Sequence, residues 1–180
     1  MGALVALVVT KLLIGLGGIS GARFGTMPSE VAARWRVPIH FVWLGEHPGI
    51  GHAPLCEQGV IGSATFGGPG DGVPGFRSAW FLHGAVTDSG IGIGTAFAKA
   101  RSAYGARLRR LPSNHPLNYD AAFSDLFPSG DVSLFTVESA TPPRNVIVIA
   151  FLRGRVVLLG WGELQLLGGD AFTPPDGVHC

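Results

Sequence analysis

The sequence predicts an α+β fold built from two tandem repeats, each a short helix followed by antiparallel strands. The first observation is a pattern that occurs twice: residues 24–35 align with residues 93–104, which places Gly25 on Gly94. Self-similarity over a long period indicates a duplicated structural unit. The second is that each copy carries apolar residues at helical spacing, and the third is that apolar runs separated by turn residues follow each copy. We therefore expect helices laid on one face of an antiparallel sheet.

The first expected helix begins after Thr26, because a threonine hydroxyl can accept hydrogen bonds from the free amides of a first turn. Pro28 is compatible with this helix only in that first turn. Val31 and Trp35 then form an apolar stripe along one side, and Pro38 ends the helix.

The second expected helix follows the same plan. Thr95 stands where Thr26 stands in the first copy and is expected to cap the helix. Phe97, Ala100 and Tyr104 recur at spacings of three and four, so they form the matching buried stripe.

Six apolar runs between turn-rich connections are expected to be strands. In the first half they are 39–44, 60–66 and 78–86, and in the second half 133–138, 145–152 and 155–161. The link Leu152-Arg153-Gly154-Arg155 between the last two runs indicates a hairpin.

The chain divides into three parts on this interpretation. Residues 1–17 form an apolar segment, either a degenerate export signal or a strand, and residues 18–88 form the first α+β repeat. Residues 89–180 form the second repeat with a C-terminal tail. Lys11 lies inside the apolar run rather than before it, which is atypical of a signal peptide and unfavourable in a membrane span. Any membrane contact is expected only through residues 2–17.

Charge and composition indicate a folded protein without a nucleic-acid partner. The chain has 13 Lys and Arg against 12 Asp and Glu, a net charge of +1, and 47% hydrophobic residues. Nucleic-acid binding normally requires a basic stripe, and here the densest basic run is Arg107, Arg109 and Arg110. We interpret that run as the solvated end of a helix.

The segment 80–104 (WFLHGAVTDSGIGIGTAFAKARSAY) and the Gly-Ile…Phe-Gly…Pro-x-Glu-Val stretch at 18–31 resemble a family of small exported bacterial tandem-repeat proteins. The architecture is similar to that of β-lactamase inhibitory protein and of the small repeat domains of outer-membrane lipoproteins. In those proteins two copies can form a concave binding face. The chain departs from the family pattern at Met27 and Ala96, where a threonine is usual. The resemblance implies a non-enzymatic, secreted or extracytoplasmic protein that binds an unknown protein or envelope component.

Aromatic residues on the expected strands are the candidate binding face. Trp80 and Phe81 are adjacent, so they point to opposite sides of a strand, and one of them is available as an exposed anchor. Packing inside the core is the alternative role for these side chains. The full candidate set is Trp43, Trp80, Phe81 and Trp161.

The two cysteines, Cys56 and Cys180, are expected to form a disulfide. Their even number and the exported character of the similar proteins imply this pairing. Two unrelated thiols are the alternative.

A second function class remains open at the glycine-rich stretch 13–21. Gly15 and Gly17, with Ser20 in the place of a third glycine, resemble a dinucleotide-binding turn, and Glu46 would then bind the ribose. On this alternative the chain is a small nucleotide-dependent oxidoreductase or a fragment of one. A purely structural repeat domain at the envelope is a third possibility.

No catalytic residue, metal ligand or cofactor is assigned. Glu46, His47, His52 and Cys56 share one loop, but their spacing matches no common metal motif, and we expect an exposed loop. A Gly-x-Ser-x-Gly nucleophile motif does not occur in the sequence.

Overall fold

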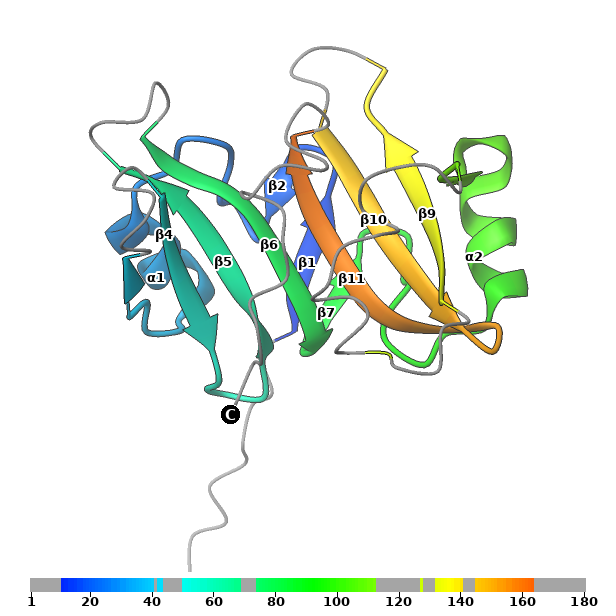
Figure 1. Cartoon of the computed structure of the whole chain (residues 1–180), viewed down its shortest axis with the longest axis horizontal. Coiled ribbons are helices and arrows are strands. Elements are labelled where there is room, and N and C mark those ends of the chain that lie inside the picture. Colours follow the sequence, from blue (N-terminus) through cyan, green and yellow to red (C-terminus); the bar gives the residue numbers. More distant parts are fainter. Residues whose placement is uncertain are drawn as a thin grey trace, which may run out of the picture.

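The computed structural model describes residues 11–40, 42–43, 50–68, 74–112, 127, 132–140 and 145–163. In this part of the chain, eleven strands accompany two α-helices and one short 3-10 helix. Most strands belong to one antiparallel sheet, and the helices and a small second sheet lie against it (Figure 1).

The main sheet has eight strands in the order β3-β4-β5-β6-β11-β10-β9-β8. Every neighbouring pair is antiparallel. The strands are β3 (Val42–Trp43), β4 (Ile50–Leu55), β5 (Ile61–Gly67), β6 (Gly75–His83), β8 (Arg109–Arg110), β9 (Val132–Glu138), β10 (Asn145–Leu152) and β11 (Arg155–Glu163).

The second sheet is small and lies behind the centre of the main sheet in Figure 1. Its order is β2 (Gly18–Ile19), β1 (Leu12–Gly15) and β7 (Ala85–Thr87). Strand β1 forms a tight antiparallel hairpin with β2 and pairs in parallel with β7. This parallel pairing joins the start of the described chain to the segment that leads into the second half.

The helices are short: α1 spans Pro28–Trp35 and α2 spans Phe97–Tyr104, followed by the 3-10 helix η1 (Gly105–Arg107). The expected threonine caps are wrong. The N-cap of each helix is the residue after the threonine, and it makes no side-chain capping bond. Instead, the Thr26 hydroxyl accepts a hydrogen bond from the backbone amide of Arg23, and the Thr95 hydroxyl accepts one from the backbone amide of Gly92. Each threonine thus closes the turn that precedes its helix.

The expected α+β class with two helix-plus-sheet repeats is wrong: the protein is mostly β. The physical reason is the contact between β6 and β11, which pair through Ser78–Phe81 and Leu159–Gly162. These hydrogen bonds join the strands of both halves into one sheet, so the two halves share a core instead of forming two balanced units. Each helix has only eight residues, which is too short to cover half of such a sheet alone.

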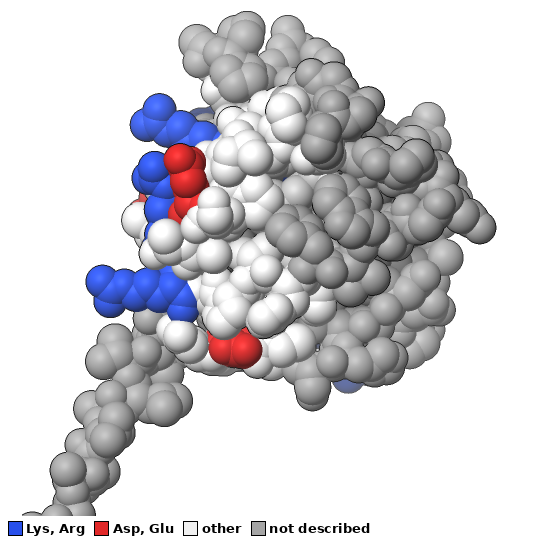
Figure 2. All heavy atoms as spheres, turned by 90° about the vertical axis from the view of Figure 1, so that its left-hand side faces the viewer, with Lys and Arg blue, Asp and Glu red and all other residues white. Residues whose placement is uncertain are grey.

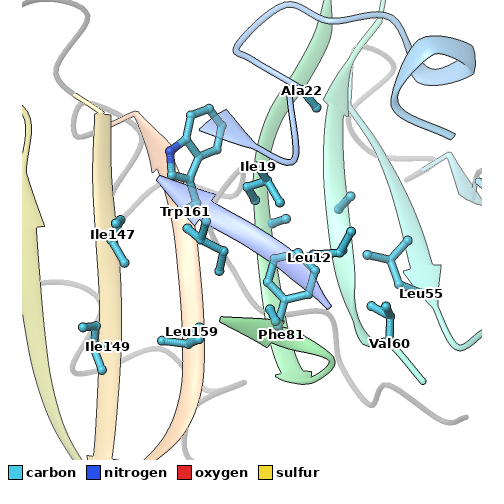
Figure 3. Packing of buried hydrophobic residues seen from close by; sticks show 14 of the residues in the cluster. Leu12, Ile19, Ala22, Leu55, Val60, Phe81, Ile147, Ile149, Leu159 and Trp161 are labelled. Atoms are coloured by element: carbon cyan, nitrogen blue, oxygen red, sulfur yellow. The ribbon is translucent and has the colours of Figure 1, made fainter. Parts of the chain in front are cut away.

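One hydrophobic cluster spans both halves between the main sheet and the layer behind it (Figure 3). Trp35 at the end of α1 is fully buried, and its indole N–H donates to the carbonyl of Ile19 at 2.8 Å. Its ring meets Phe76 and Phe81 of β6 edge to face. Phe76 in turn stacks on Trp161 of β11 at a centroid distance of 5.3 Å. Aromatic packing therefore links α1 to strands from both halves.

The other face of the main sheet carries a second buried cluster. It contains Trp80 of β6 and apolar residues of β9, β10 and β11, with Phe127 packed against it. Trp80 and Phe81 belong to different clusters, which confirms that adjacent aromatics on this strand point to opposite sides.

The expected strands 60–66, 133–138 and 155–161 lie near β5, β9 and β11, and 145–152 coincides with β10. The expected strand 78–86 is instead two strands, β6 and β7, which belong to different sheets, and within 39–44 the described strand is only Val42–Trp43.

Strand β4 was missed, because Pro48, Gly49 and Gly51 suggested an exposed loop. It forms because six residues of β4 pair with β5. Strand β3 pairs only with Gly51 and His52, so β4 is an edge strand at Pro54, where proline is tolerated.

We predict that Gly160→Ala destabilises the fold by about 1–3 kcal/mol, because an added methyl group in a packed site forces its neighbours to move. Gly160 pairs with Trp80, and a Cβ on Gly160 would overlap the indole ring. Urea denaturation measures the loss. Gly17→Ala is the control, since a Cβ there has nothing within 4 Å.

The loss should shrink in a Trp80→Leu background, where the smaller side chain leaves room for the methyl group. An equal loss in both backgrounds would show that the indole ring is not the obstacle.

Candidate functional site

The described members of the predicted aromatic face are buried. Trp80 is 2% exposed, and Phe81 and Trp161 are fully buried. The side chain of Trp43 lies outside the described part of the structure. An anchor must be reachable by its partner, so in this conformation Trp80, Phe81 and Trp161 offer packing rather than a binding surface.

The glycine-rich stretch forms a hairpin. Gly15 pairs with Gly18 across the β1–β2 turn, which contains Gly17. The Ser20 hydroxyl accepts a hydrogen bond from the amide of Leu13. A dinucleotide-binding turn leads from a strand directly into a helix whose N-terminus faces the pyrophosphate. Between residues 12 and 27 the chain contains no such helix, and Glu46 lies outside the described residues.

The candidate metal loop is partly described. His52 lies on β4, 8% exposed, with its Nδ1 atom 3.3 Å from the Thr65 hydroxyl. Burial lowers the pKa of His52 below its ordinary value. Glu46 and His47 lie outside the described part, and within it no three His, Cys, Asp or Glu residues are grouped as metal ligands.

Cys56 is exposed in the turn between β4 and β5. Cys180 lies outside the described residues, so the expected disulfide stays a prediction. The described helices include none with the length and apolar character needed to cross a membrane.

The surface feature best suited to binding is a hollow of about 380 Å³ beside α2. We call it the aromatic hollow, and its aromatic lining consists of Phe97, Phe135 and Phe151. The three ring centroids lie 5.1–5.4 Å apart, with two of the pairs edge to face. Phe151 is 3% exposed, whereas Phe97 and Phe135 are half-buried. The rings therefore support one another and still present apolar surface.

Three elements position these rings. Phe135 lies on β9 and Phe151 on β10, and they point to the same side of the sheet as Ile149, the partner of Phe135 across the two strands. Phe97 is the first residue of α2, and its amide donates to the carbonyl of Gly154 at 2.8 Å. This bond fixes the start of α2 against the β10–β11 turn, at the far right in Figure 1.

The β10–β11 turn contributes a cation to the rim. Arg153 and Gly154 both have positive φ, 50° and 72°, as a two-residue hairpin turn of type I′ requires. Arg153 is exposed, lines the aromatic hollow and makes no hydrogen bond or ion pair with the residues that the structure describes. Arg110 reaches the hollow through Ser133, a lining residue: its Nη2 donates to the Ser133 hydroxyl at 3.4 Å.

The chemistry of the described lining favours binding over catalysis. It consists of three phenylalanines, Ser133, Arg153 and Gly154. A serine is a weak nucleophile without an adjacent general base, and these lining residues include no His, Cys, Asp or Glu. Apolar rings with a few polar groups at the rim are typical of recognition sites.

A second hollow, of about 290 Å³, is less suited to recognition. It is lined mainly by glycines and small residues around β7, with Lys11 and His83 at its edge. Its described lining contains no Phe, Tyr or Trp, and the residues that precede Lys11 lie outside the described part.

Sequence reasoning missed the aromatic hollow although part of its signal was visible. The turn Arg153-Gly154 was expected, and Phe97 was placed in the buried stripe of the second helix. The missing information was the register that sets Phe151 opposite Ser133 and Phe135 opposite Ile149. It follows from how β9 pairs with β10 and from where α2 packs on these strands, and the residue pattern of each segment fixes neither.

Comparisons with protein-family models, with curated proteins and with solved structures give no match. The resemblance to exported tandem-repeat proteins therefore rests on the sequence pattern alone.

We predict that His52→Gln weakens the acid sensitivity of the fold. The unfolded chain binds a proton on this histidine near pH 6.5, whereas the lowered pKa keeps the folded side chain neutral to a lower pH. The free energy of unfolding therefore falls as the pH drops from about 6.5 towards the folded-state pKa. Gln can still bond Thr65 but does not titrate. Thermal melts between pH 7.5 and 5 measure the effect, and an identical pH dependence of both proteins would contradict it.

Proposed function

We propose that this protein is a non-enzymatic binding protein that engages a protein partner through the aromatic hollow. The observation that carries the proposal is the set of three mutually packed rings, two of them half-buried, beside exposed arginines. Aromatic residues, phenylalanine included, and arginine are enriched at protein interfaces. The volume of about 380 Å³ suits the insertion of one side chain from a partner.

Rigidity supports this proposal. Phe97 is held by the backbone bond to Gly154, and Arg155 donates from Nη1 to the carbonyl of Gly94 at 3.0 Å. The α2 start and the β10–β11 turn are thus fixed to each other. A site that is already ordered loses less conformational entropy on binding.

We place the activity outside the cytoplasm, on the resemblance to exported proteins and on the cysteine pair. The nucleotide-dependent alternative is less favoured, because Gly15 and Gly18 form a hairpin rather than a strand-to-helix turn.

We predict that Ser133→Trp abolishes partner capture while the fold is kept. The half-buried Ser133 lines the aromatic hollow, so an indole at this position fills it without removing any packed group. Ser102→Trp, on the exposed side of α2, is the matched control. The measurement is a quantitative pull-down from envelope extract and culture supernatant, with circular dichroism to verify folding. Equal capture by both variants would contradict binding through the aromatic hollow.

We predict that protein recovered from an oxidising compartment contains a Cys56–Cys180 disulfide. In the loop-entropy model, closing a loop of more than about 100 residues stabilises a protein by at most about 4–5 kcal/mol. Thiol titration of the unfolded, unreduced protein should detect no free thiol, and two after reduction. Two free thiols before reduction would remove both the pairing and the main support for an extracytoplasmic location.

A further inference from the structure

We propose that the aromatic hollow recognises an acidic peptide segment of its partner: an aromatic side chain enters between the phenylalanines while neighbouring carboxylates bind Arg153 and Arg110. This inference rests on the proposed function and specifies the chemistry of the partner. It follows from the charge around the hollow, from the backbone of Arg153 and from the geometry of the rings.

The described segments that supply the lining residues are rich in positive charge. Residues 91–112, 132–137 and 145–162 contain no Asp or Glu, and the next acidic residues along β9 and β11 are Glu138 and Glu163. The cations of these segments are Lys99, Arg101, Arg107, Arg109, Arg110, Arg153 and Arg155. The chain as a whole has a net charge of only +1, so this is a local excess. A surface of one sign favours a partner of the opposite sign and speeds their encounter.

The α1 end of the molecule is different. There, basic and acidic side chains lie next to each other (Figure 2). Helix α1 itself carries Glu30 in its first turn and Arg34 in its last, whereas α2 carries Lys99 and Arg101 and no acidic residue. The positive excess therefore belongs to the surroundings of the aromatic hollow and is not general.

Two arginines in the positive surroundings already bind backbone carbonyls. Arg101 donates to Leu108 at 3.2 Å and Arg155 donates to Gly94. Arg153 has no partner among the described residues, and the contact of Arg110 with Ser133 is long, at 3.4 Å. The free N–H groups of Arg153 and Arg110 can bind a carboxylate in the bidentate geometry that arginine favours.

The backbone of the β10–β11 turn does not explain why residue 153 is an arginine. At φ 50° the first position of a type I′ turn favours Asn, Asp or Gly. An arginine here is less suited to the backbone than those residues are, and its side chain lines the hollow. Arg36 also has positive φ, so what distinguishes Arg153 is that its side chain lines the hollow and has no partner among the described residues.

The rings indicate which side chain enters. Phe97 meets Phe151 edge to face, at 81°, and Phe151 meets Phe135 at 86°. Edge-to-face and offset stacking are favourable for further aromatic rings. An aromatic residue flanked by carboxylates therefore matches both parts of the site.

The test uses fluorescence anisotropy with a labelled peptide that has a central Phe between two Glu residues on each side. Two matched peptides replace Phe with Ala, or every Glu with Gln. The proteins are wild type, Arg153→Asn and Arg36→Asn. Arg36 is an ideal control, because it is exposed, has φ 55° and lies at the end of α1. The two variants therefore make the same charge change in the same backbone conformation.

We expect the wild-type protein to bind the Glu-Phe peptide and to bind each matched peptide at least about tenfold more weakly, the typical loss of a charge-assisted hydrogen bond or a buried side chain. The affinity of Arg153→Asn for the Glu-Phe peptide should fall by a similar factor, and the affinity of Arg36→Asn should equal that of wild type within about twofold. Because Asn suits positive φ, the melting temperature of Arg153→Asn should not fall, which separates lost recognition from lost folding. Higher salt should weaken binding.

The inference is overturned if the Glu-Phe peptide does not bind, if either matched peptide binds equally well, or if both arginine variants behave alike. Displacement of the peptide by free 3-phenylpropanoate at similar concentration would assign the hollow to a small aromatic acid instead. If the peptide assay fails but Ser133→Trp no longer captures a partner in the pull-down, the proposed binding function stands and the partner has a different chemistry. Failure in both experiments would remove the two proposals together.

Discussion

The pairing of β6 with β11 is the constraint on which the rest of the structure depends. Four residues of each strand are in register there, and this contact is the only direct ladder between the strands of the first half and those of the second in the described main sheet. It brings Phe76 onto Trp161 and creates one continuous core. Behind it, the parallel pairing of β1 with β7 joins the start of the described chain to the segment that leads into the second half. Because both contacts lie at the centre, the periphery of the sheet is left to the helices.

The aromatic hollow is a consequence of this arrangement. Helix α2 covers the end of the sheet far from the central contact, and its eight residues are held at the start by the bond from Phe97 to Gly154. Where a short helix meets a strand turn, apolar surface of the sheet is not completely covered. Phe135 therefore stays half-buried, while Trp161 near the centre is fully enclosed. Site and core differ in their distance from the β6–β11 contact rather than in residue type.

Local sequence signals predicted several parts of this picture. The spacing of Val31 and Trp35 indicated a helix with a buried side, and both residues are buried. The apolar run at 145–152 indicated a strand, which is β10. By contrast, the threonine before each helix suggested a cap and instead closes a turn. Whether its hydroxyl bonds forward or backward depends on the preceding turn, and a residue pattern does not determine this choice.

By itself, the sequence determined the features that depend on neighbours along the chain: the two helix positions, most strands, the Arg153–Gly154 turn and the opposite orientation of Trp80 and Phe81. Only the tertiary structure decided that the strands form one sheet, that Trp80, Phe81 and Trp161 are buried, and that Phe97, Phe135 and Phe151 meet beside two arginines. The physical reason is that burial and strand order follow from pairing between distant segments. Periodicity along the chain records which side a residue faces, but not what lies against that side.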